Sequence, residues 1–252
     1  MVYVNRNTAT EQLKSLVELS LQKNLDYMPN KFNEQQREAL ELLQKRVQLE
    51  EIIEESVSFN KNLIFEPQNE NLHLINSAEE LVDVFSLRSD VYGGLGYQSE
   101  FPDIIEGLNF DKFDKNSAIL YYGQKKNATG SVRLIFDSQE KLPIDKEYSL
   151  SSLRNDHNLI GEFSRLIVKN DTKGLGLEFK HLMGGIYNVV INNDIDRLAS
   201  VIIEHHYKLY SKFGAMSVVD KLENYGSLNL PALIISWDPN KISTFFKRAM
   251  LS

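Results

Sequence analysis

The segment GEFSRLIV at residues 161–168 combines the apolar residues of a buried strand with a carboxylate and a guanidinium. Burying Glu162 and Arg165 costs free energy unless each is paired or used in chemistry. Because side chains alternate along a strand, residues three positions apart point to opposite faces. A β-bulge near Ser164 would bring both to one face, and bulges occur next to active sites. The segment is therefore either a strand with buried ion pairs or a strand that takes part in a reaction.

Two further stretches contain residues suited to chemistry. In IVKNDTKGLGLEFKHL, Lys173, Gly174 and Gly176 precede a helix that follows a strand. Backbone N–H groups and the helix dipole can bind phosphate or another anion there, although glycine is also frequent in tight turns. In ASVIIEHHYKLYSKFGAMSVV, Tyr210 lies on a short helix between two strands, where it is either a core residue or a hydroxyl donor.

The pattern of strand, short helix with Leu-Tyr-x-Lys-Phe-Gly, and strand resembles the GNAT acyltransferase superfamily. An ordered set of residues narrows the resemblance to acyl-homoserine-lactone synthases and long-chain N-acyl amino acid synthases, over about residues 63–252. Those enzymes have an Arg-x-x-x-aromatic pair, a spaced Asp pair, an Arg after Gly-x, and Glu-x-Ser-Arg, in that order. The residues that match here are Arg88, Tyr92, Tyr97, Asp111, Asp114, Arg133, Glu162 and Arg165.

This resemblance implies a role for each residue. Glu162 would be the general base, because an amine must lose a proton when it attacks a thioester. Arg165 and Arg133 would hold the strand in register and pair with acidic partners, and Tyr210 would lie near the departing thiolate. The acceptor pocket would contain Arg88, Tyr92, Tyr97, Asp111, Asp114 and Arg133. The pantetheine and phosphate of the donor would lie against Lys173, Gly174 and Gly176.

The sequence departs from these families at some of the same places. Asp171 stands where GNAT enzymes usually have Gln or Arg, which favours a carrier-protein donor with its single phosphodiester. Tyr92 and Tyr97 stand where lactone synthases typically have Phe and Trp. The acceptor pocket is therefore expected to differ from that of a lactone synthase.

The function that the resemblance implies is N-acyl transfer. We expect a fatty acyl group to move from a thioester on acyl carrier protein or coenzyme A to the amine of an amino acid or related metabolite. No tightly bound cofactor is expected, and with no Cys, direct attack is favoured over an acyl-enzyme. The alternatives are an autoinducer synthase that acylates S-adenosylmethionine, a small-acyl enzyme that uses acetyl-coenzyme A, and an inactive module that only binds acyl ligands.

Residues 1–62 are expected to form a helical extension, because they contain no Gly, one Pro and many Glu, Gln, Lys and Leu. Leu13, Leu16, Val17 and Leu21 have helical spacing, and a second helix is predicted from about Asn33 to Ser58. Such helices pack on the main domain or on a second copy of the chain, so a homo-oligomer is one expectation.

Residues 63–252 are predicted to form a GNAT-like α/β (α+β) domain with a mixed, splayed central sheet flanked by helices. Strands are predicted at NLHLI, SAILYYGQ, ATGSVRLIF, GEFSRLIV, RLASVII, AMSVV and ALIISW. A helix with a Ser77–Glu80 capping box should run to about Tyr92 and be followed by the glycine-rich loop GGLGYQSEFPD. Further helices are predicted from KNDTKGLG to about Val190, at EHHYKLYSKFG and at PNKISTFFKRAML.

Composition excludes several other classes. A net charge of −7 argues against a nucleic-acid binder, and the absence of Cys excludes thiolate metal sites. No metal site is expected, because His205 and His206 are not in a zinc-binding pattern. We see no signal peptide and no membrane span, and therefore expect a cytoplasmic protein. Lys241, Lys247 and Arg248 could form a solvated helix face or meet an acidic carrier protein.

Overall fold

One mixed sheet forms the centre of the protein. The computed structural model describes residues 4–21, 32–101, 105, 107–156, 159–169 and 176–251. Its seven-stranded sheet has the order β1-β2-β3-β4-β5-β7-β6, and only β4 and β5 are parallel neighbours. The strands are β1 Leu72–Leu74, β2 Ser117–Gln124, β3 Asn127–Phe136, β4 Ile160–Val168, β5 Arg197–Ile203, β6 Met216–Leu222 and β7 Ala232–Trp237. The seven predicted strands and the mixed α/β class are confirmed.

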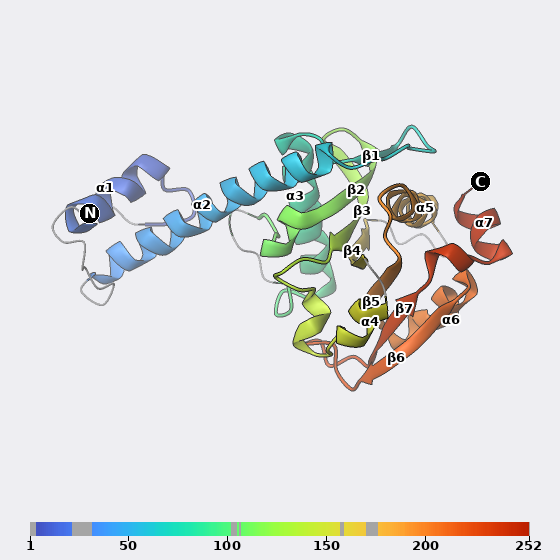
Figure 1. The fold of residues 1–252 in the computed structure, drawn as a ribbon. Helices are drawn as coiled ribbons and strands as arrows, with labels where there is room; N and C mark the ends of the chain where they lie inside the picture. The colour runs from blue at the N-terminus through green and yellow to red at the C-terminus, as the bar shows by residue number, and fades with distance from the viewer. Residues whose placement is uncertain are drawn as a thin grey trace.

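Helices cover both faces of this sheet (Figure 1). On one face, α5 (Leu177–Asn192) packs against Ala118 and Leu120 of β2, and α7 (Thr244–Met250) packs on α5. On the other face, α3 (Ala78–Leu95) packs against Ile119 and Tyr121. All four of these β2 residues are buried, and successive residues belong to different cores, as in a strand that is covered on both sides. The sheet thus separates two apolar cores.

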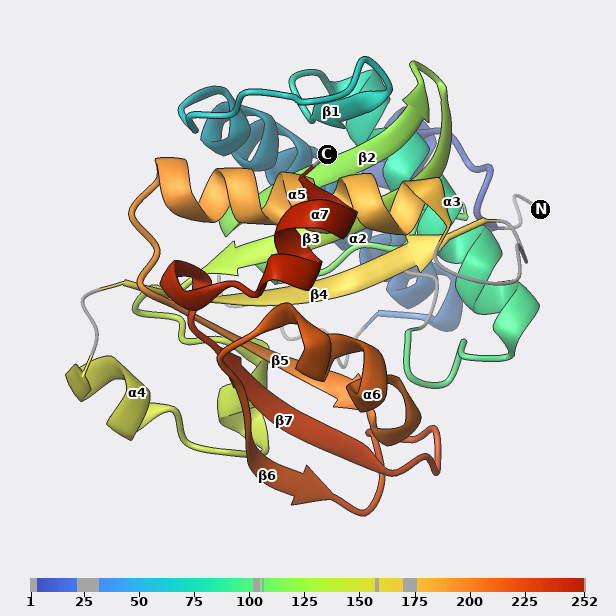
Figure 2. The ribbon, with the colours of Figure 1, turned by 90° about the vertical axis from the view of Figure 1, so that its right-hand side faces the viewer.

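The sheet opens between β4 and β5. These strands pair only from Ile160 with Arg197 to Glu162 with Ala199. Beyond this last rung, β4 continues beside β3 and β5 continues beside β7, so that the two strands diverge (Figure 2). The Ser200 hydroxyl donates to the Phe163 carbonyl at 2.8 Å just past the rung. The predicted splay of the central strands is confirmed, and it places Glu162 where the gap begins.

The predicted β-bulge is also present in β4. Arg133 pairs with Ser164, and Ser131 pairs with Ile167, so that a step of two residues on β3 faces a step of three on β4. Arg165 lies within the bulge and has a φ of +54°. A left-handed φ is rare for a residue with a Cβ atom. The bulge removes the strand alternation that would otherwise place Glu162 and Arg165 on opposite faces.

The two N-terminal helices are α1 (Thr10–Leu21) and α2 (Glu34–Lys61), and α2 ends three residues later than expected. Asn33 caps α2 in a reciprocal box with Gln36. Leu13 and Val17 of α1 pack on Ala39 in the first half of α2, which projects from the body (Figure 1). The second half packs on α3 and the sheet, where the Asn60 side chain accepts from the Ile119 N–H at 2.9 Å.

Several local predictions need correction. The helix α3 continues through Gly93 and Gly94 to Leu95 and ends at Gly96, so these two glycines belong to the helix and not to the loop. The Glu80 carboxylate accepts from the Asn76 N–H, one residue before the position that a capping box requires. The last helix begins at Thr244, after a separate turn η6 (Pro239–Lys241).

The stretch predicted as one helix before Gly214 is three consecutive short elements, η4 (Glu204–His206), α6 (Tyr207–Tyr210) and η5 (Ser211–Phe213). Three short elements were not predicted at all, η2 (Lys112–Asn116), η3 (Pro143–Lys146) and α4 (Ser151–Asp156).

Candidate active site

Glu162 is a buried carboxylate with no cationic partner among the described residues. The residue is 4% exposed. Its carboxylate accepts one described hydrogen bond, from the Ile144 N–H at 3.0 Å. Within the described part of the chain it takes part in no ion pair. Burial raises the pKa of Glu162 to about 7, although the Ile144 N–H and the charge of Arg133 act to lower it. Such a carboxyl can change its protonation state near neutral pH.

The neighbouring charges on the same face form what we call the charge network, Arg88, Asp111, Asp114, Arg133 and Arg165. Arg133 Nη1 lies 2.6 Å from Asp111 Oδ1 and 3.0 Å from Asp114 Oδ1. Asp114 also binds Arg88 at 2.8 Å, and Asp111 binds Arg165 at 2.9 Å. Arg133 and Arg165 therefore pair with Asp111 and Asp114, the partners that the sequence suggested.

Asp111 and Arg133 of the charge network remain charged at neutral pH. Burial would raise the pKa of Asp111, but the guanidinium groups of Arg133 and Arg165 outweigh burial and hold this pKa well below its usual range. Conversely, burial would lower the pKa of Arg133, and the carboxylates of Asp111 and Asp114 keep it above its ordinary value. Paired in this way, the network fixes the geometry of β3, β4 and η2.

The spacing of the Asp pair has a local structural cause. Asp111 is the N-cap of η2, and its Oδ1 accepts from the Phe113 N–H at 2.9 Å. Asp114 returns the interaction, because its Oδ2 accepts from the Asp111 N–H at 2.9 Å. Each carboxylate keeps its other oxygen for an arginine of the network. The Asp-x-x-Asp motif is therefore a capping box that also binds the sheet.

Aromatic rings surround the guanidinium of Arg165. It lies 4.2 Å from the ring centre of Phe101 and 5.4 Å from that of Tyr92, and these rings contact each other at 4.4 Å. Cation–π contacts of this kind stabilise a partly desolvated arginine. Tyr97 packs in the same apolar cluster as Tyr92, and no contact joins it to the charge network among the described residues.

Arg88 lies behind the site and not on its surface. Its side chain is fully buried, and its Nε and Nη2 atoms have no hydrogen-bond partner in the described ranges. Burial lowers its pKa despite the nearby Asp114. Since Asp114 is equally inaccessible, a ligand would meet the outer members of the network first, Asp111 and Arg165.

Tyr225, in the loop between β6 and β7, is a further residue at the site, and the sequence patterns do not indicate it. Its ring lies 6.3 Å from that of Phe101, and the Ser227 N–H in the same loop donates to Glu100 Oε2 at 2.7 Å. Burial raises the pKa of Tyr225 to about 12, with Arg165 and Glu162 among the charged groups nearby. No motif marks this tyrosine, because only the fold of the sheet brings β6 beside the charge network.

Tyr210 lies on the opposite face of β4. Its ring is buried among Phe213, Phe163 and Phe179, at centre-to-centre distances of 5.4, 6.1 and 6.2 Å. Burial raises the pKa of its hydroxyl above the ordinary value. Because Phe163 directly follows Glu162, Tyr210 and Glu162 flank the strand at the point where β4 and β5 separate.

The predicted donor-binding residues are only partly described. Gly176 is the N-cap of α5, the helix that follows β4. Lys173, Gly174 and the unusual Asp171 lie outside the described residues.

The described residues contain no cluster of His, Cys, Asp and Glu that could hold a metal ion. His205 and His206 are both exposed, with ring centres 4.0 Å apart. Within the same ranges, no helix is long and apolar enough to cross a membrane.

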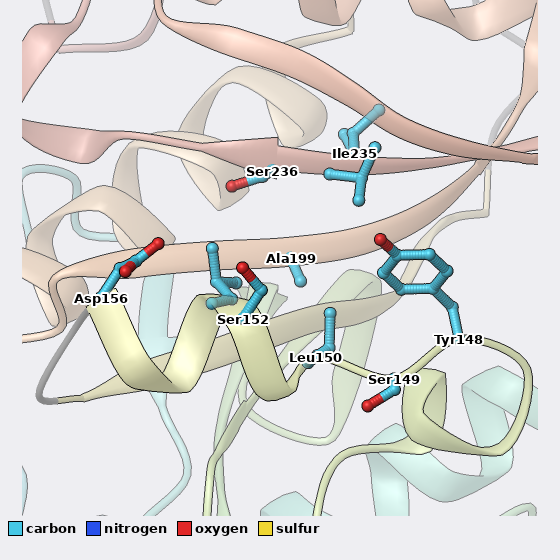
Figure 3. A pocket seen from close by; sticks show the side chains of 10 residues that line it. Tyr148, Ser149, Leu150, Ser152, Asp156, Ala199, Ile235 and Ser236 are labelled. Carbon is cyan, nitrogen blue, oxygen red and sulfur yellow. The ribbon is translucent and has the colours of Figure 1, made fainter.

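A cavity of about 140 Å³ lies between α4 and the strands β5, β6 and β7 (Figure 3). It is lined by Tyr148, Ser149, Leu150, Ser152, Leu153, Asp156, Ala199, Val219, Ile235 and Ser236. Ala199 is the rung partner of Glu162, so the cavity and Glu162 lie on the same face of the sheet. Glu162 is not among the lining residues, and the cavity is therefore a neighbour of the site and not its centre.

Comparisons with known proteins identify the family of this chain. The family described as N-acyl amino acid synthase FeeM matches residues 83–238, more than half of the chain. The matched range includes the charge network, Glu162 and Tyr210. No significant match was found among curated protein sequences.

Solved structures share the fold. FeeM, an N-acyl amino acid synthase from uncultured soil microbes, has a TM-score of 0.54 at 17% identity, over 71% of this chain and 94% of that one. The acyl-homoserine-lactone synthase LasI has a TM-score of 0.53 at 16% identity, over 71% and 93%. BjaI, a coenzyme-A-dependent synthase of the same kind, has a TM-score of 0.51 at 17% identity, over 68% and 79%.

Proposed function

We propose, because this chain belongs to the N-acyl amino acid synthase FeeM family, that it transfers a fatty acyl group from a thioester to the amine of an amino acid or related metabolite. Family membership makes the protein an N-acyltransferase. The acyl group, the donor and the particular amine are the part that we propose.

The observation on which this proposal rests is the state of Glu162. An acceptor amine must give up a proton as its nitrogen attacks the thioester carbonyl carbon, and a base with a pKa near the working pH is the most effective. Glu162 has a pKa of about 7 and lies at the opening between β4 and β5. A thioester in this opening would have its carbonyl carbon beside the carboxylate. The C–N bond forms, Glu162 takes the proton directly or through a water, and the C–S bond breaks.

Tyr210 would serve the leaving group from the other side of β4. Negative charge develops on sulfur as the C–S bond breaks, and a neutral hydroxyl can donate a hydrogen bond to it. The raised pKa of Tyr210 keeps that hydroxyl protonated at neutral pH. In the competing interpretation, Tyr210 only packs its ring against Phe213 and Phe163.

The charge network would orient the acceptor. The Asp111 side chain is 26% exposed and can meet an ammonium group, while Arg165, with Tyr92 beside it, can meet a carboxylate. Arg133 would hold Asp111 in place, and the buried Arg88 and Asp114 would support Arg133 from behind. Tyr97 would complete the apolar wall of the pocket.

For the donor, we propose acyl carrier protein, with acyl-coenzyme A as the alternative. The start of α5 at Gly176, with Lys173 and Gly174 before it, would bind the phosphate of the phosphopantetheine arm. Lys241, Lys247 and Arg248 are exposed near the C-terminus and would meet the acidic carrier protein.

Reversing both charges at Lys247 and Arg248 should raise the apparent KM for acyl carrier protein several-fold, with an effect that fades at high salt. Lys45→Glu on the distant α2 is the control. Equal efficiency with acyl-coenzyme A and acyl carrier protein in all variants would contradict the proposed donor.

Residues 63–252 are proposed to be the catalytic part, with residues 1–62 as an extension that pairs two copies of the chain. Val47 on α2 is 54% exposed, which supports an apolar contact there. Sedimentation of the full chain and of Val47→Glu tests this, because a dimer held by α2 should become monomeric in the variant.

The test of the function is the identity of the product. Cells that express the protein should accumulate N-acyl amino acids, which mass spectrometry of a lipid extract would identify, and cells that express Glu162→Gln should not. Purified protein given acyl donor with an amino acid mixture, or with S-adenosylmethionine, then distinguishes an amide product from a lactone. A lactone or an acetylated product would replace the proposed function with one of its alternatives.

A further inference from the structure

The only described hydrogen bond to Glu162 comes from a segment between β3 and β4 that no motif marks. Ile144 belongs to the short turn η3, and its N–H donates to Glu162 Oε2 at 3.0 Å. A turn of four residues has little stability of its own. Something else must therefore hold the N–H at this position.

Asp145 closes the start of η3 and binds η3 to the segment that follows it. Its Oδ2 accepts from the Leu142 N–H at 3.0 Å, and its Oδ1 accepts from the Leu150 N–H at 3.2 Å. These two donors bracket Ile144 in the chain. One carboxylate thus closes the turn that contains the N–H bound to Glu162.

Arg154 on α4 binds Asp145 and anchors it to the sheet. Its Nη1 and Nη2 atoms contact the two Asp145 oxygens at 2.7 and 2.5 Å. Its Nε and Nη2 atoms also contact Asp137, just after β3, at 2.6 and 2.8 Å. Two paired bonds to each carboxylate fix the geometry in a way that a single charge contact cannot.

Four charged or titratable groups face Glu162 from the elements around it. Arg133 of β3 favours its ionised form, whereas Asp111 of η2 and Asp145 of η3 oppose it. Tyr225 of the β6–β7 loop is the fourth, and it is neutral at pH 7. Asp145 has a pKa of about 2 and is ionised at neutral pH, because Arg154 and the two N–H groups outweigh the effect of burial. Arg154 is the cation that offsets this nearby charge.

We propose that Arg154 is a positioning residue for the acyl transfer: through Asp145 and η3 it holds the Ile144 N–H against Glu162 and neutralises Asp145, so that Glu162 can act as a base near neutral pH. This inference rests on the proposed function for the role of Glu162 as base. The contacts within η3 and α4 do not depend on it.

Loss of Arg154 acts on Glu162 in two ways with the same sign. Asp145 keeps its negative charge without a partner, and this charge disfavours a second carboxylate nearby. The turn also loses its anchor, so the stabilising N–H bond to Glu162 is weakened. Both effects raise the pKa of Glu162, and the enzyme then needs a higher pH to reach full rate.

The test compares pH profiles of kcat for the wild type, Arg154→Gln and Arg154→Lys. Arg154→Gln should move the acid limb up by about one pH unit. At pH values below the limb kcat then falls roughly tenfold, and at pH values above it kcat is unchanged. Arg154→Lys keeps the charge but not the paired geometry, so its shift should be smaller. KM for the amine should change little, because Arg154 does not touch the acceptor site.

Arg197→Gln is the matched control. Arg197 is the first residue of β5 and pairs with Asp238. Its side chain is about as exposed as that of Arg154, 21% against 24%. Its profile should keep the wild-type acid limb. A wild-type limb in both Arg154 variants, or an equal shift in Arg197→Gln, would overturn the inference. If Arg154→Gln does not fold, Arg154→Lys and Asp137→Asn must show the smaller upward shift.

A second measurement separates this inference from the proposed function. Titration of ¹³C-labelled glutamate by NMR, with the Glu162 signal assigned from Glu162→Gln, reads the carboxyl directly without turnover. A raised Glu162 pKa in Arg154→Gln, together with a fully active Glu162→Gln, supports the positioning and rejects the base. An unchanged Glu162 pKa with an inactive Glu162→Gln rejects the positioning and leaves the base in place.

Discussion

Asp111 and Glu162 are carboxylates on the same face of the sheet, Asp111 with a partly exposed side chain and Glu162 buried. Both lie within reach of the charge of Arg133, yet their surroundings shift the two pKa values in opposite directions. Asp111 contacts two guanidinium groups, which hold its pKa well below the usual range. Glu162 has one backbone N–H and a pKa of about 7. A carboxylate with partners has a fixed charge and determines shape. A carboxyl that is buried without a cation can exchange a proton at neutral pH.

The largest expected effect comes from removing a partner inside the charge network. Asp114→Ala leaves the buried charge of Arg88 uncompensated and leaves Arg133 with Asp111 alone, because both arginines bind Asp114 Oδ1. The free energy of unfolding should fall by about 3–5 kcal/mol, measured by urea denaturation. Asp220→Ala, at an exposed carboxylate of β6, is the control and should change it by less than about 0.5 kcal/mol. A loss that small in Asp114→Ala would show that the network does not determine the fold.

Glu162 should instead make stability depend on pH. Its folded pKa of about 7 lies above the ordinary value of 4.5, so the native state binds the proton more tightly than the unfolded chain. The resulting stability is fully present below pH 4.5 and is lost as the pH rises through 7, a change of about 3 kcal/mol. Glu162→Gln resembles the protonated form and lacks this loss. The free energy of unfolding of the variant should therefore equal that of the wild type at pH 4 and exceed it at pH 8, as measured by denaturation at both pH values. The same difference between the two proteins at both pH values would contradict this expectation.

Glu162→Gln also tests whether Glu162 is the general base of the reaction. Glu162→Gln keeps the size of the side chain and can still accept from Ile144, but it cannot take a proton from an amine. The rate constant kcat should fall by about 100-fold, the usual scale of a general base. Glu140→Gln, an exposed carboxylate on the loop after β3, should retain full activity. If Glu162→Gln does so too, Glu162 is a structural residue.

A smaller effect is expected on the other face of β4, where Tyr210 is buried and has no charged partner in the described part of the chain. Tyr210→Phe keeps the ring contacts and removes the hydroxyl, so kcat should fall about tenfold while Tm hardly changes. Tyr210→Ala should lower Tm as well, because it leaves a cavity among Phe163, Phe179 and Phe213. Full activity in the Phe variant would remove Tyr210 from the mechanism.

The sequence was most informative where the local pattern contained a contradiction. Glu162 and Arg165 could share a face only if the strand were irregular, and the bulge between Ser164 and Ile167 is that irregularity. The long apolar strands could be predicted for a simpler reason, because a strand that is buried on both faces has a continuous apolar run in its sequence. Asp111 and Asp114 have a spacing that a capping box explains locally.

Ile144, Arg154 and Tyr225 could not be predicted from the same patterns. Ile144 contributes a backbone N–H, which leaves no trace in a sequence. Arg154 is anchored by Asp137, 17 residues earlier, and lies on a helix too short to show a helical period. Tyr225 reaches the site only because β6 is placed at the edge of the sheet beyond β7. In all three cases the signal is in the tertiary arrangement.

The bulge makes position 165 a place where folding and chemistry have opposite requirements. A φ of +54° suits glycine and costs an L-residue about 1–2 kcal/mol, so the backbone alone would select Gly there. The site instead requires a guanidinium that reaches Asp111 and lies on Phe101. Sequence design guided by backbone preference alone would therefore replace this arginine first, and would gain a relaxed strand at the cost of the charge that Asp111 binds.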